Sequence, residues 1–390
     1  MKSILGLLQS IFFFKRLKRN SLSYHSSIFF LVIILFSITE LSNAQNKEKK
    51  FLNYTEFSAD IGTIYDSNIL KYSDKYIEKF LNNEDQGRFL IKTYDDLYIY
   101  SSLKAAVRFN LIKQRSSKIR LIYTRRTFLK NNIKSWDYFK ADFLQRINKR
   151  ALLNINYSYI PDFYIRHFRD FDWVEMYGYS SETFQEFAFS KDNFGVWFQY
   201  TFFSDSKLRF NFNYSEYFYN EHFTEYDCKN FQYGLNLYQP VHPKIELEIG
   251  LKYGSSETKE LDEQIYRLNY SDASYYETVF LLGVNIELPN FRKYSNGLNL
   301  DFSYNKRSFT STNTIETDPL HAGRTDDNFK LKLAYRIQLT ESFTLSAFYD
   351  RRHRYLNNSA EANKDFLIEE KNYNQYLAGF KLLYTIKLKH

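Results

Sequence analysis

Charged side chains recur at every second position along much of this chain, and they are the first candidates for chemistry. In "NFKLKLAYRIQL", Lys330, Lys332 and Arg336 alternate with apolar residues. A row of charges on one face can line a water-filled passage with a mild preference for anions. It can also form ion pairs that stiffen or close an interior. The sequence leaves both interpretations open.

Twenty charged residues share this inward position in the alternating pattern, and we predict that they line a lumen. The basic ones are Lys104, Arg108, Arg120, Arg126, Lys140, Arg146, Arg209, Lys252, Lys330, Lys332, Arg336, Lys381 and Lys387. The acidic ones are Asp60, Asp142, Glu246, Glu248, Glu287, Asp301 and Asp350. A basic residue that points at lipid at mid-depth costs about 2–4 kcal/mol, and acidic residues cost less. A lumen is therefore the natural place for these side chains.

Catalytic groupings are weak. An omptin-like protease needs His and carboxylates together in outer loops, and "RHFRDFDW" offers His167, Asp170 and Asp172. Nothing in the spacing fixes their geometry. The other histidines considered, His222, His321 and His353, have no Ser at strand spacing. We find no HExxH, Walker or EF-hand pattern, and we expect no enzymatic activity and no cofactor.

Three carboxylates in predicted loops are candidate metal ligands. Asp318, Asp326 and Asp327 could bind Ca²⁺ at the surface, and Asp326 and Asp327 could also serve a protease-like site. Carboxylates are common in solvated loops, so we expect neither role. Cys228 is the only cysteine, which excludes an intramolecular disulfide and any cysteine-cluster metal site.

The elements that carry these residues are strands, because apolar and polar residues alternate with period two. In "SKLRFNFNYSEYF", Leu208, Phe210 and Phe212 alternate with Arg209 and Asn211. Strands of soluble proteins usually have about five to six residues. These segments run to roughly ten or more residues, which suits a tilted strand that crosses a bilayer. The pattern predicts an all-β, transmembrane, antiparallel up-and-down β-barrel.

We predict about fourteen strands, with twelve or sixteen as alternatives. The segments are 54–66, 96–112, 117–130, 135–147, 150–163, 184–203, 207–219, 226–239, 244–256, 273–288, 296–309, 327–339, 342–355 and 374–389. The least secure is 184–203, where residues 190–193 could form a turn. Short breaks alternate with longer polar ones such as 67–95, 164–182, 256–272, 310–326 and 356–373. Periplasmic turns and extracellular loops alternate in this way in outer-membrane barrels.

Aromatic residues near the segment ends favour the same fold. Tyr and Phe supply most of the 19% aromatic share. Rings at the headgroup level are favoured at membrane interfaces. The predicted outward rings are Tyr123, Tyr157, Tyr159, Tyr200, Phe202, Tyr214, Tyr253, Tyr304, Tyr335, Tyr349 and Tyr384.

The first residues have the order of a secretory signal. A basic stretch precedes the apolar run Ile28 to Ile38, and "SNAQ" follows with small residues at the cleavage positions. We predict a signal peptide at 1–44 with cleavage near Ala44–Gln45, a short periplasmic stretch at 45–53, and the barrel at 54–390. An uncleaved anchor helix is the alternative. The predicted location is the outer membrane of a Gram-negative bacterium.

The net charge of +8 raises nucleic acid as a partner, but the basic residues are spread through alternating segments without a recognition motif. We therefore expect no nucleic-acid binding. Outer-membrane lipid or lipopolysaccharide is the expected partner, and other outer-membrane or periplasmic proteins are further candidates. The mean hydropathy of −0.51 argues against a bundle of membrane helices.

The stretch "GTIYDSNIL" ends the first predicted strand and contains Tyr65, Asp66, Ser67 and Asn68. It resembles the element that opens the barrel domain of surface lipoprotein assembly modifiers. That resemblance implies a fourteen-stranded barrel, although the tetratricopeptide module of those proteins is missing before residue 54. The style of the sequence resembles outer-membrane proteins of the Bacteroidota. The C-terminal residue is His390, whereas many proteobacterial barrels end in an aromatic residue.

Two functional hypotheses follow. The first is a narrow, porin-like channel for small solutes, with anions as a candidate class, based on the charged inward face. The alternative is a non-enzymatic barrel subunit of an export or surface-protein assembly complex. That alternative rests on the "YDSN" resemblance and on polar outer loops that are long enough to dock partners.

Overall fold

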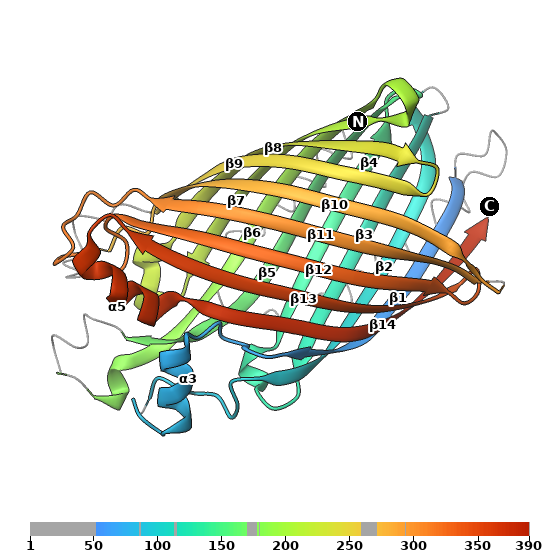
Figure 1. Cartoon of the computed structure of the whole chain (residues 1–390). Coiled ribbons are helices and arrows are strands. Elements are labelled where there is room, and N and C mark those ends of the chain that lie inside the picture. The colour runs from blue at the N-terminus through green and yellow to red at the C-terminus, as the bar shows by residue number, and fades with distance from the viewer. Residues whose placement is uncertain are drawn as a thin grey trace. The chain divides into compact units, whose positions relative to one another are not determined.

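The computed structural model describes residues 52–85, 87–112, 115–169, 178, 180–258, 271–292 and 294–389. Within them, fourteen antiparallel strands form a closed barrel, in which sequence neighbours pair and β1 pairs with β14 (Figure 1). The prediction of a fourteen-stranded up-and-down barrel is confirmed. The predicted signal segment 1–44 and nearly all of 45–53 lie outside the described residues and stay predictions.

Most strands follow the predicted segments within a few residues. Their bounds are β1 (Leu52–Asp66), β2 (Asp96–Ile112), β3 (Arg115–Phe128), β4 (Trp136–Arg146), β5 (Ala151–Arg169), β6 (Phe184–Thr201), β7 (Lys207–Tyr219), β8 (Cys228–His242), β9 (Ile245–Thr258), β10 (Tyr275–Phe291), β11 (Tyr294–Phe309), β12 (Arg324–Gln338), β13 (Phe343–Asn358) and β14 (Tyr373–Lys389). Two predicted loops begin or end inside strands: β5 continues to Arg169, so His167 lies in a strand, and β12 begins at Arg324, so Asp326 does too. The doubtful segment is one strand, because residues 189–201 of β6 pair with β7 without a break.

The described helices lie in the connections. They are α3 (Asp74–Leu81), α5 (Glu361–Lys371) and the short 3-10 helices η2 (Asn132–Lys134), η3 (Ser181–Thr183), η4 (Phe203–Asp205) and η5 (Glu221–Tyr226). None of the helices in the described residues is long and apolar enough to cross a membrane.

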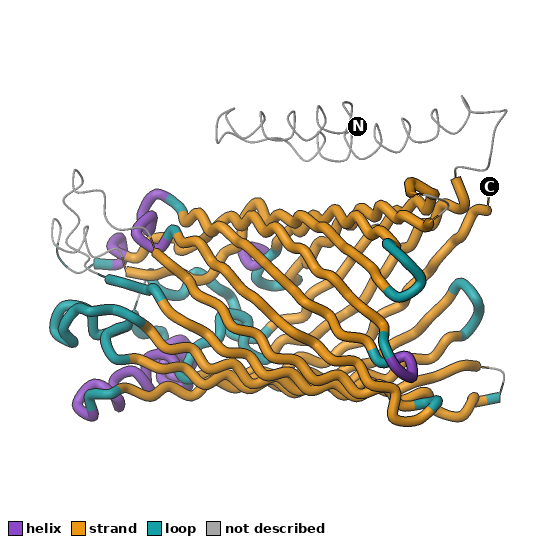
Figure 2. Tube along the Cα trace, turned by 90° about the horizontal axis from the view of Figure 1, so that it is seen from above, coloured by secondary structure: helices purple, strands orange, loops and turns teal. Residues whose placement is uncertain are grey.

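The two ends of the barrel differ in their connections. One end, here called the turn end, has short links such as 147–150 and 339–342, and β1 begins there beside the end of β14. The other end, the loop end, carries α3, α5 and the longer connections, and the strands run obliquely between the two (Figure 2). This alternation matches the predicted pattern of short turns and long loops.

The seam between β1 and β14 closes the barrel and depends on small residues. Gly379 lies opposite Ile64, whose side chain is buried. A Cβ atom at Gly379 would come within 2.6 Å of the Thr63 carbonyl oxygen and 2.7 Å of Ile64 Cγ1. Real Cβ atoms do not approach backbone so closely, so the two strands pair at this distance only with glycine at position 379.

We expect Gly379→Val to destabilise the barrel by overpacking, by about 1–3 kcal/mol. Unfolding by urea in detergent micelles, followed by the loss of β-sheet circular dichroism, measures the change. Ala378→Val adds similar bulk at the next residue, on the opposite face, and should change the free energy of unfolding far less. Equal effects of the two substitutions would contradict this account of the seam.

Candidate functional site

The predicted lumen-lining residues lie on strand faces opposite the exposed apolar side chains. On β12, Leu331 and Leu333 are 46% and 43% exposed, and Lys330 and Lys332 lie on the other face. The register also sets Lys332 beside Asp301 of β11. Opposite charges on neighbouring strands stabilise a sheet.

Part of the predicted set forms ion pairs within the barrel. The pairs are Arg120 with Asp142 at 2.6 Å, Lys140 with Asp142 at 3.1 Å, Lys330 with Asp350 at 3.6 Å and Lys104 with Asp60 at 4.0 Å. Glu246 pairs with Lys207 of β7 at 2.9 Å. Several of the predicted inward charges therefore form ion pairs with one another or with a neighbouring strand, which is one of the two arrangements that the sequence left open.

The other predicted residues have different neighbours. Arg108 stacks on Tyr54, Arg126 on Tyr98 and Trp136, Lys381 on Tyr100, and Arg209 on Trp197 and Tyr238. Glu248 accepts a hydrogen bond from Asn236, and Arg146 donates one to the Lys149 carbonyl. By register Lys252 lies opposite Gly234, Glu287 opposite Gly297, Arg336 opposite Ser346, and Lys387 opposite Glu56.

Water reaches the middle of this inner face. The side chains of Arg120 and Lys330 are 42% and 43% exposed, although both point away from the apolar outer surface. Their carboxylate partners Asp142 and Asp350 are buried beneath them. The lumen at this level is therefore a polar, water-accessible space with the basic groups on its surface.

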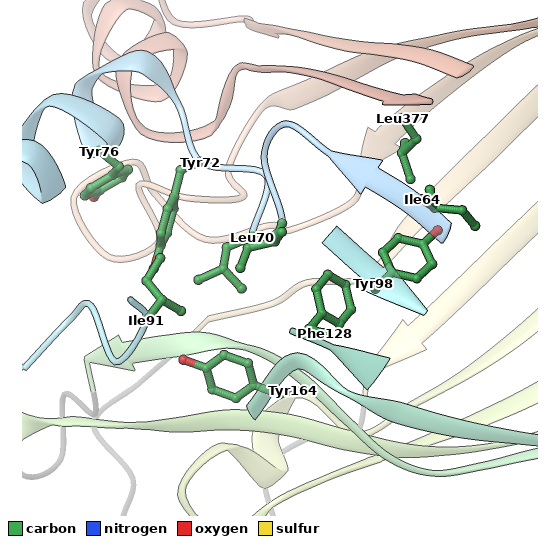
Figure 3. Packing of buried hydrophobic residues seen from close by; sticks show 10 residues of the cluster. Ile64, Leu70, Tyr72, Tyr76, Ile91, Tyr98, Phe128, Tyr164 and Leu377 are labelled. Carbon is green, nitrogen blue, oxygen red and sulfur yellow. The ribbon is translucent and has the colours of Figure 1, made fainter. Parts of the chain in front are cut away.

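The loop end is different, because residues 67–95 fold against the inner wall. We call these residues the inserted segment. Its buried side chains pack with wall residues from β1, β2, β3, β5 and β14 (Figure 3). The cluster consists of Ile64, Ile69, Leu70, Tyr72, Tyr76, Ile91, Tyr98, Phe128, Tyr164 and Leu377. Apolar burial of this kind holds the inserted segment in place against the wall.

The "YDSN" residues anchor the start of the inserted segment. Asn68 is 1% exposed; its side-chain amide donates to the carbonyl of Tyr72 at 2.7 Å, and its carbonyl accepts from the Tyr72 backbone at 2.8 Å. The same amide reaches the Asn374 carbonyl of β14 at 3.1 Å. One side chain thus closes the turn over residues 68–72 and ties it to the wall.

The neighbouring motif residues complete the anchor. Asp66 accepts from Gln375 at 2.7 Å and from the Asn68 backbone at 3.0 Å. Ser67 exchanges hydrogen bonds with Tyr376 through its backbone and hydroxyl, and Tyr65 donates to Asp95 at 2.8 Å. We predicted the motif to be the outer rim of the first strand, and in the structure it also fastens both ends of the inserted segment.

Lys71 stands out within this turn. Its backbone φ is 54°, in the left-handed region that few residues other than glycine adopt. Its side chain is exposed, whereas Leu70 and Tyr72 on either side are buried. Although water still reaches this residue, the protein atoms packed around it partly desolvate the ammonium group, and this desolvation, with Arg354 and Arg352 nearby, lowers the pKa of Lys71 to about 8.

A second lysine lies beneath the same region. Lys134 of η2 is buried, donates to the Tyr164 carbonyl and stacks on Phe163 with its nitrogen 4.3 Å from the ring centre. Burial, with the positive charge of Lys71 nearby, lowers the pKa of Lys134 to about 7.

The contacts of His321 within the described residues do not form a catalytic relay. Ser271 and Asp318 both bond to Nδ1 of His321, each at 2.9 Å. A relay needs the serine and the carboxylate on different ring nitrogens, so this group holds the loop together instead. His167 bonds through Nδ1 to the Tyr164 hydroxyl, and its proposed partners Asp170 and Asp172 lie outside the described residues.

Asp326 and Asp327 point to opposite faces of β12 and cannot act together. Asp326 is buried and forms a bidentate pair with Arg324 at 2.6 and 2.7 Å. Asp327 accepts from the Tyr304 hydroxyl at 2.6 Å on the outer face. Within the described residues, no group of three or more His, Cys, Asp or Glu side chains could hold a metal ion.

No protein-family model and no curated protein matches this chain. Solved structures with a similar fold include a bacterial polysaccharide outer membrane secretin (TM-score 0.46, 8% identity, 86% of this chain and 99% of that one). A FadL homologue from Pseudomonas aeruginosa gives 0.43 at 8% identity, with 85% and 90% covered. An anion-selective porin from Comamonas acidovorans gives 0.40 at 7%, with 85% and 98% covered. Similarity at this level does not extend to function, and the resemblances to assembly modifiers and to Bacteroidota proteins stay predictions.

Sequence reasoning missed the inserted segment, which it treated as a polar outer loop. A signal was present: Tyr76, Ile77 and Phe80 have helical spacing, and Ile69 and Leu70 precede them. Such apolar residues in a connection need a surface to pack on. The nearest such surface is the inner wall of the barrel.

We expect Asn68→Ala to loosen the inserted segment without opening the barrel. The substitution leaves buried backbone groups of Tyr72 without partners, which costs about 1–3 kcal/mol. Hydrogen exchange at residues 69–81 should become roughly tenfold to a hundredfold faster, while exchange in the strands stays slow. Asn82→Ala removes an exposed asparagine of the same segment and should change exchange little. Equal protection in the wild type and Asn68→Ala would rule out the anchoring role.

Proposed function

We propose that this chain is an integral β-barrel of a bacterial outer membrane that forms a narrow, water-filled passage for small and preferentially anionic solutes. The observation that carries the proposal is the opposite polarity of its two faces. A water-soluble barrel keeps apolar residues inside and polar ones outside, whereas here the outer face is apolar and the inner face is charged.

The outer face supports a membrane location. Apolar side chains at the middle of the strands are widely exposed, including Phe210, Leu251, Leu282, Leu331 and Phe380. Exposed apolar surface on this scale indicates contact with lipid or with a partner. A closed sheet also leaves no unpaired strand edge, which a bilayer requires.

Hydrogen-bonded pairs of a tyrosine and a carboxylate lie at the edge of the apolar band that is nearer the loop end. The pairs lie on the outer face towards the loop end: Tyr123 with Asp137 at 2.8 Å, Tyr214 with Glu216 at 2.6 Å, Tyr304 with Asp327 at 2.6 Å, and Tyr157 with Asp192. A tyrosine suits the interface because its ring is apolar and its hydroxyl is polar. The carboxylates are tolerated there because they lie near the interface and not at the bilayer centre.

The inner face supports a passage with a preference for anions. Thirteen of the predicted lumen residues are basic and seven are acidic. Exposed groups such as Arg120 and Lys330 place positive charge in the water of the lumen. The inserted segment reduces the cross-section at the loop end, so we infer a passage for small molecules and a constriction at that end.

The alternative, a barrel subunit of an export or surface-protein assembly complex, remains a separate proposal. It predicts stable association with other proteins through the loop end. Purification in a mild detergent distinguishes the two, because a channel is recovered alone and active, and a complex subunit is recovered with its partners.

We expect Leu333→Arg to impair insertion of the barrel into lipid, because it turns a charge towards the bilayer. A basic residue at mid-depth costs about 2–4 kcal/mol. Folding into liposomes across a urea series, read by the mobility of unheated protein on gels, measures the loss. Lys332→Leu changes the adjacent inward residue and should leave lipid insertion nearly unaffected. The lipid-facing assignment of this strand face fails if both variants insert equally well.

We expect the purified protein to give single-channel steps in a planar bilayer, with a reversal potential that shows preference for anions in a salt gradient. Lys332→Glu should move that potential towards cation preference, because it reverses a charge on the inner face. Lys306→Glu makes the same change on the outer face of β11 and should leave the potential unchanged. A barrel that gives no conductance steps would contradict the passage and favour the complex subunit.

A further inference from the structure

We propose that the loop end of the lumen contains a binding site for a small polyvalent anion that carries two or more carboxylate or phosphate groups. The site is formed by Lys71, Arg166, Arg354 and Lys371. This inference rests on the proposed function, because it names the class of solute that the passage takes and the place where it is held.

The four basic residues come from four elements that meet at the inserted segment. Lys71 and Arg354 lie on the same ring, with Lys71 Nζ 5.7 Å and Arg354 Cζ 4.9 Å from the centre of Tyr373. Lys71 belongs to the inserted segment, Arg354 to β13 and Tyr373 to the start of β14. Lys371 ends helix α5, two residues before Tyr373.

Arg166 of β5 contacts the inserted segment on both sides of Lys71. Its guanidinium donates to the carbonyl of Leu70 at 3.1 Å and lies 5.0 Å from the ring centre of Tyr72. Both contacts flank Lys71. Phe168, two residues further along β5, lies 5.2 Å from Lys371 Nζ. The contacts of Arg166 and Phe168 thus connect β5 with both the inserted segment and α5.

Within the described residues, three of these four basic groups have no carboxylate partner. Lys71, Arg166 and Lys371 form no ion pair there, and Arg354 forms one with Asp326 at 3.8 Å.

The nearby carboxylates are engaged elsewhere. Asp326 is held by Arg324, Glu370 by Lys75 and Tyr76, and Asp66 by Gln375. Positive charges that are gathered without counter-charges repel one another, and a bound anion removes that repulsion.

The backbone at Lys71 supports a binding role. A left-handed conformation is unfavourable for lysine, and strain of this kind is common at binding and active sites. The Asn68 side chain hydrogen-bonds to both the backbone carbonyl and the backbone N–H of Tyr72, and these two bonds hold the turn in this conformation. The result is an exposed lysine between two buried neighbours, with Arg354 over the same Tyr373 ring and Arg166 bonded to the preceding residue.

The mixture of cations defines the class of ligand. Guanidinium groups suit bidentate contact with a carboxylate or phosphate, and ammonium groups act as mobile point charges. One monovalent anion cannot neutralise four basic groups. A solute with several anionic groups can contact the arginines and the lysines at the same time.

The experiment measures binding to the purified full-length chain in detergent and, separately, in planar bilayers. Citrate and pyrophosphate are the probes, acetate is the monovalent comparison, and divalent cations are left out. Calorimetry should show saturable binding of at least one probe and none of acetate. The same probe should interrupt the chloride current in bilayers with a matching concentration dependence.

Substitutions separate the site from the general charge of the lumen. Lys71→Gly and Lys371→Gln should each weaken binding roughly tenfold or more, as loss of a charge-assisted hydrogen bond does. Lys71→Arg keeps the charge and should retain most of the affinity. Lys252→Gln removes a lumen charge on β9, away from the four residues, and should leave the dissociation constant unchanged. Because glycine accepts the left-handed backbone, Lys71→Gly should keep the melting temperature or raise it, so misfolding does not explain the lost affinity.

The pH dependence gives an independent readout. A bound anion stabilises the protonated form of Lys71, so affinity should be highest below its pKa of about 8 and fall as pH rises above it. The charged groups around Lys71 are Arg166, Arg352, Arg354, Asp66 and Lys134. The arginines do not titrate in this range. Lys134 has a pKa of about 7 and burial also lowers the pKa of Lys371, but both lysines are present in the wild type and in Lys71→Gly, so the difference between the two proteins reports on Lys71. Lys71→Gly should reduce the fall in affinity between pH 7 and pH 9.

The outcomes distinguish the site from the passage. Binding that the four residues control, without conductance, would support the site and contradict the passage. Conductance without saturable binding or block by citrate or pyrophosphate would overturn the site and leave the passage standing. Binding that Lys71→Gly and Lys252→Gln weaken equally would also overturn the site, because it would reflect lumen charge alone.

Discussion

Pairing of every backbone N–H and C=O group is the constraint on which the rest of this structure depends. In lipid each unpaired group costs several kcal/mol, so the sheet must close. Closure gives each strand one outward and one inward face, and period-two alternation then decides what each face contains. Leu331 and Lys330 are one residue apart on β12 and meet opposite surroundings. The charged lumen is thus a direct consequence of closure combined with an apolar exterior.

Closure of the sheet does not determine the structure of the loop end. There the inserted segment depends on its own contacts with the inner wall. The segment gains apolar burial through Leu70 and Tyr72, but a buried connection also needs partners for its backbone. Asn68 supplies several of these at once, because one amide group serves both backbone groups of Tyr72 and reaches β14. The "YDSN" residues are therefore better understood as a structural anchor than as a label for a type of barrel.

Local sequence was enough to predict the strands. An alternating pattern such as that of residues 327–339 already indicates which side chains share a face and how long the strand is. The same reasoning could not place the inserted segment, since its apolar residues pack on β5 and β14, which are distant in sequence. The predicted inward charges also do not include Lys71, Arg166, Arg354 and Lys371. Lys71 and Lys371 lie outside the strands, and two register shifts interrupt β5 between Ile160 and Arg166. Only the folded chain brings these residues to one place.

The balance of basic and acidic side chains differs between the middle of the lumen and its loop end, so the expected attraction for an anion differs as well. At mid-depth, carboxylates such as Asp142 and Asp350 lie beneath basic groups and moderate their charge, so a passing anion is attracted weakly. At the loop end, basic groups gather next to a dry aromatic cluster, where lower polarity strengthens every electrostatic interaction. In the proposed passage, an anion that enters from the loop end would therefore meet its strongest attraction at the inserted segment and weaker attraction beyond it. Such an order would let the anion bind first and then leave towards the turn end, since conduction requires binding strong enough for entry and weak enough for exit.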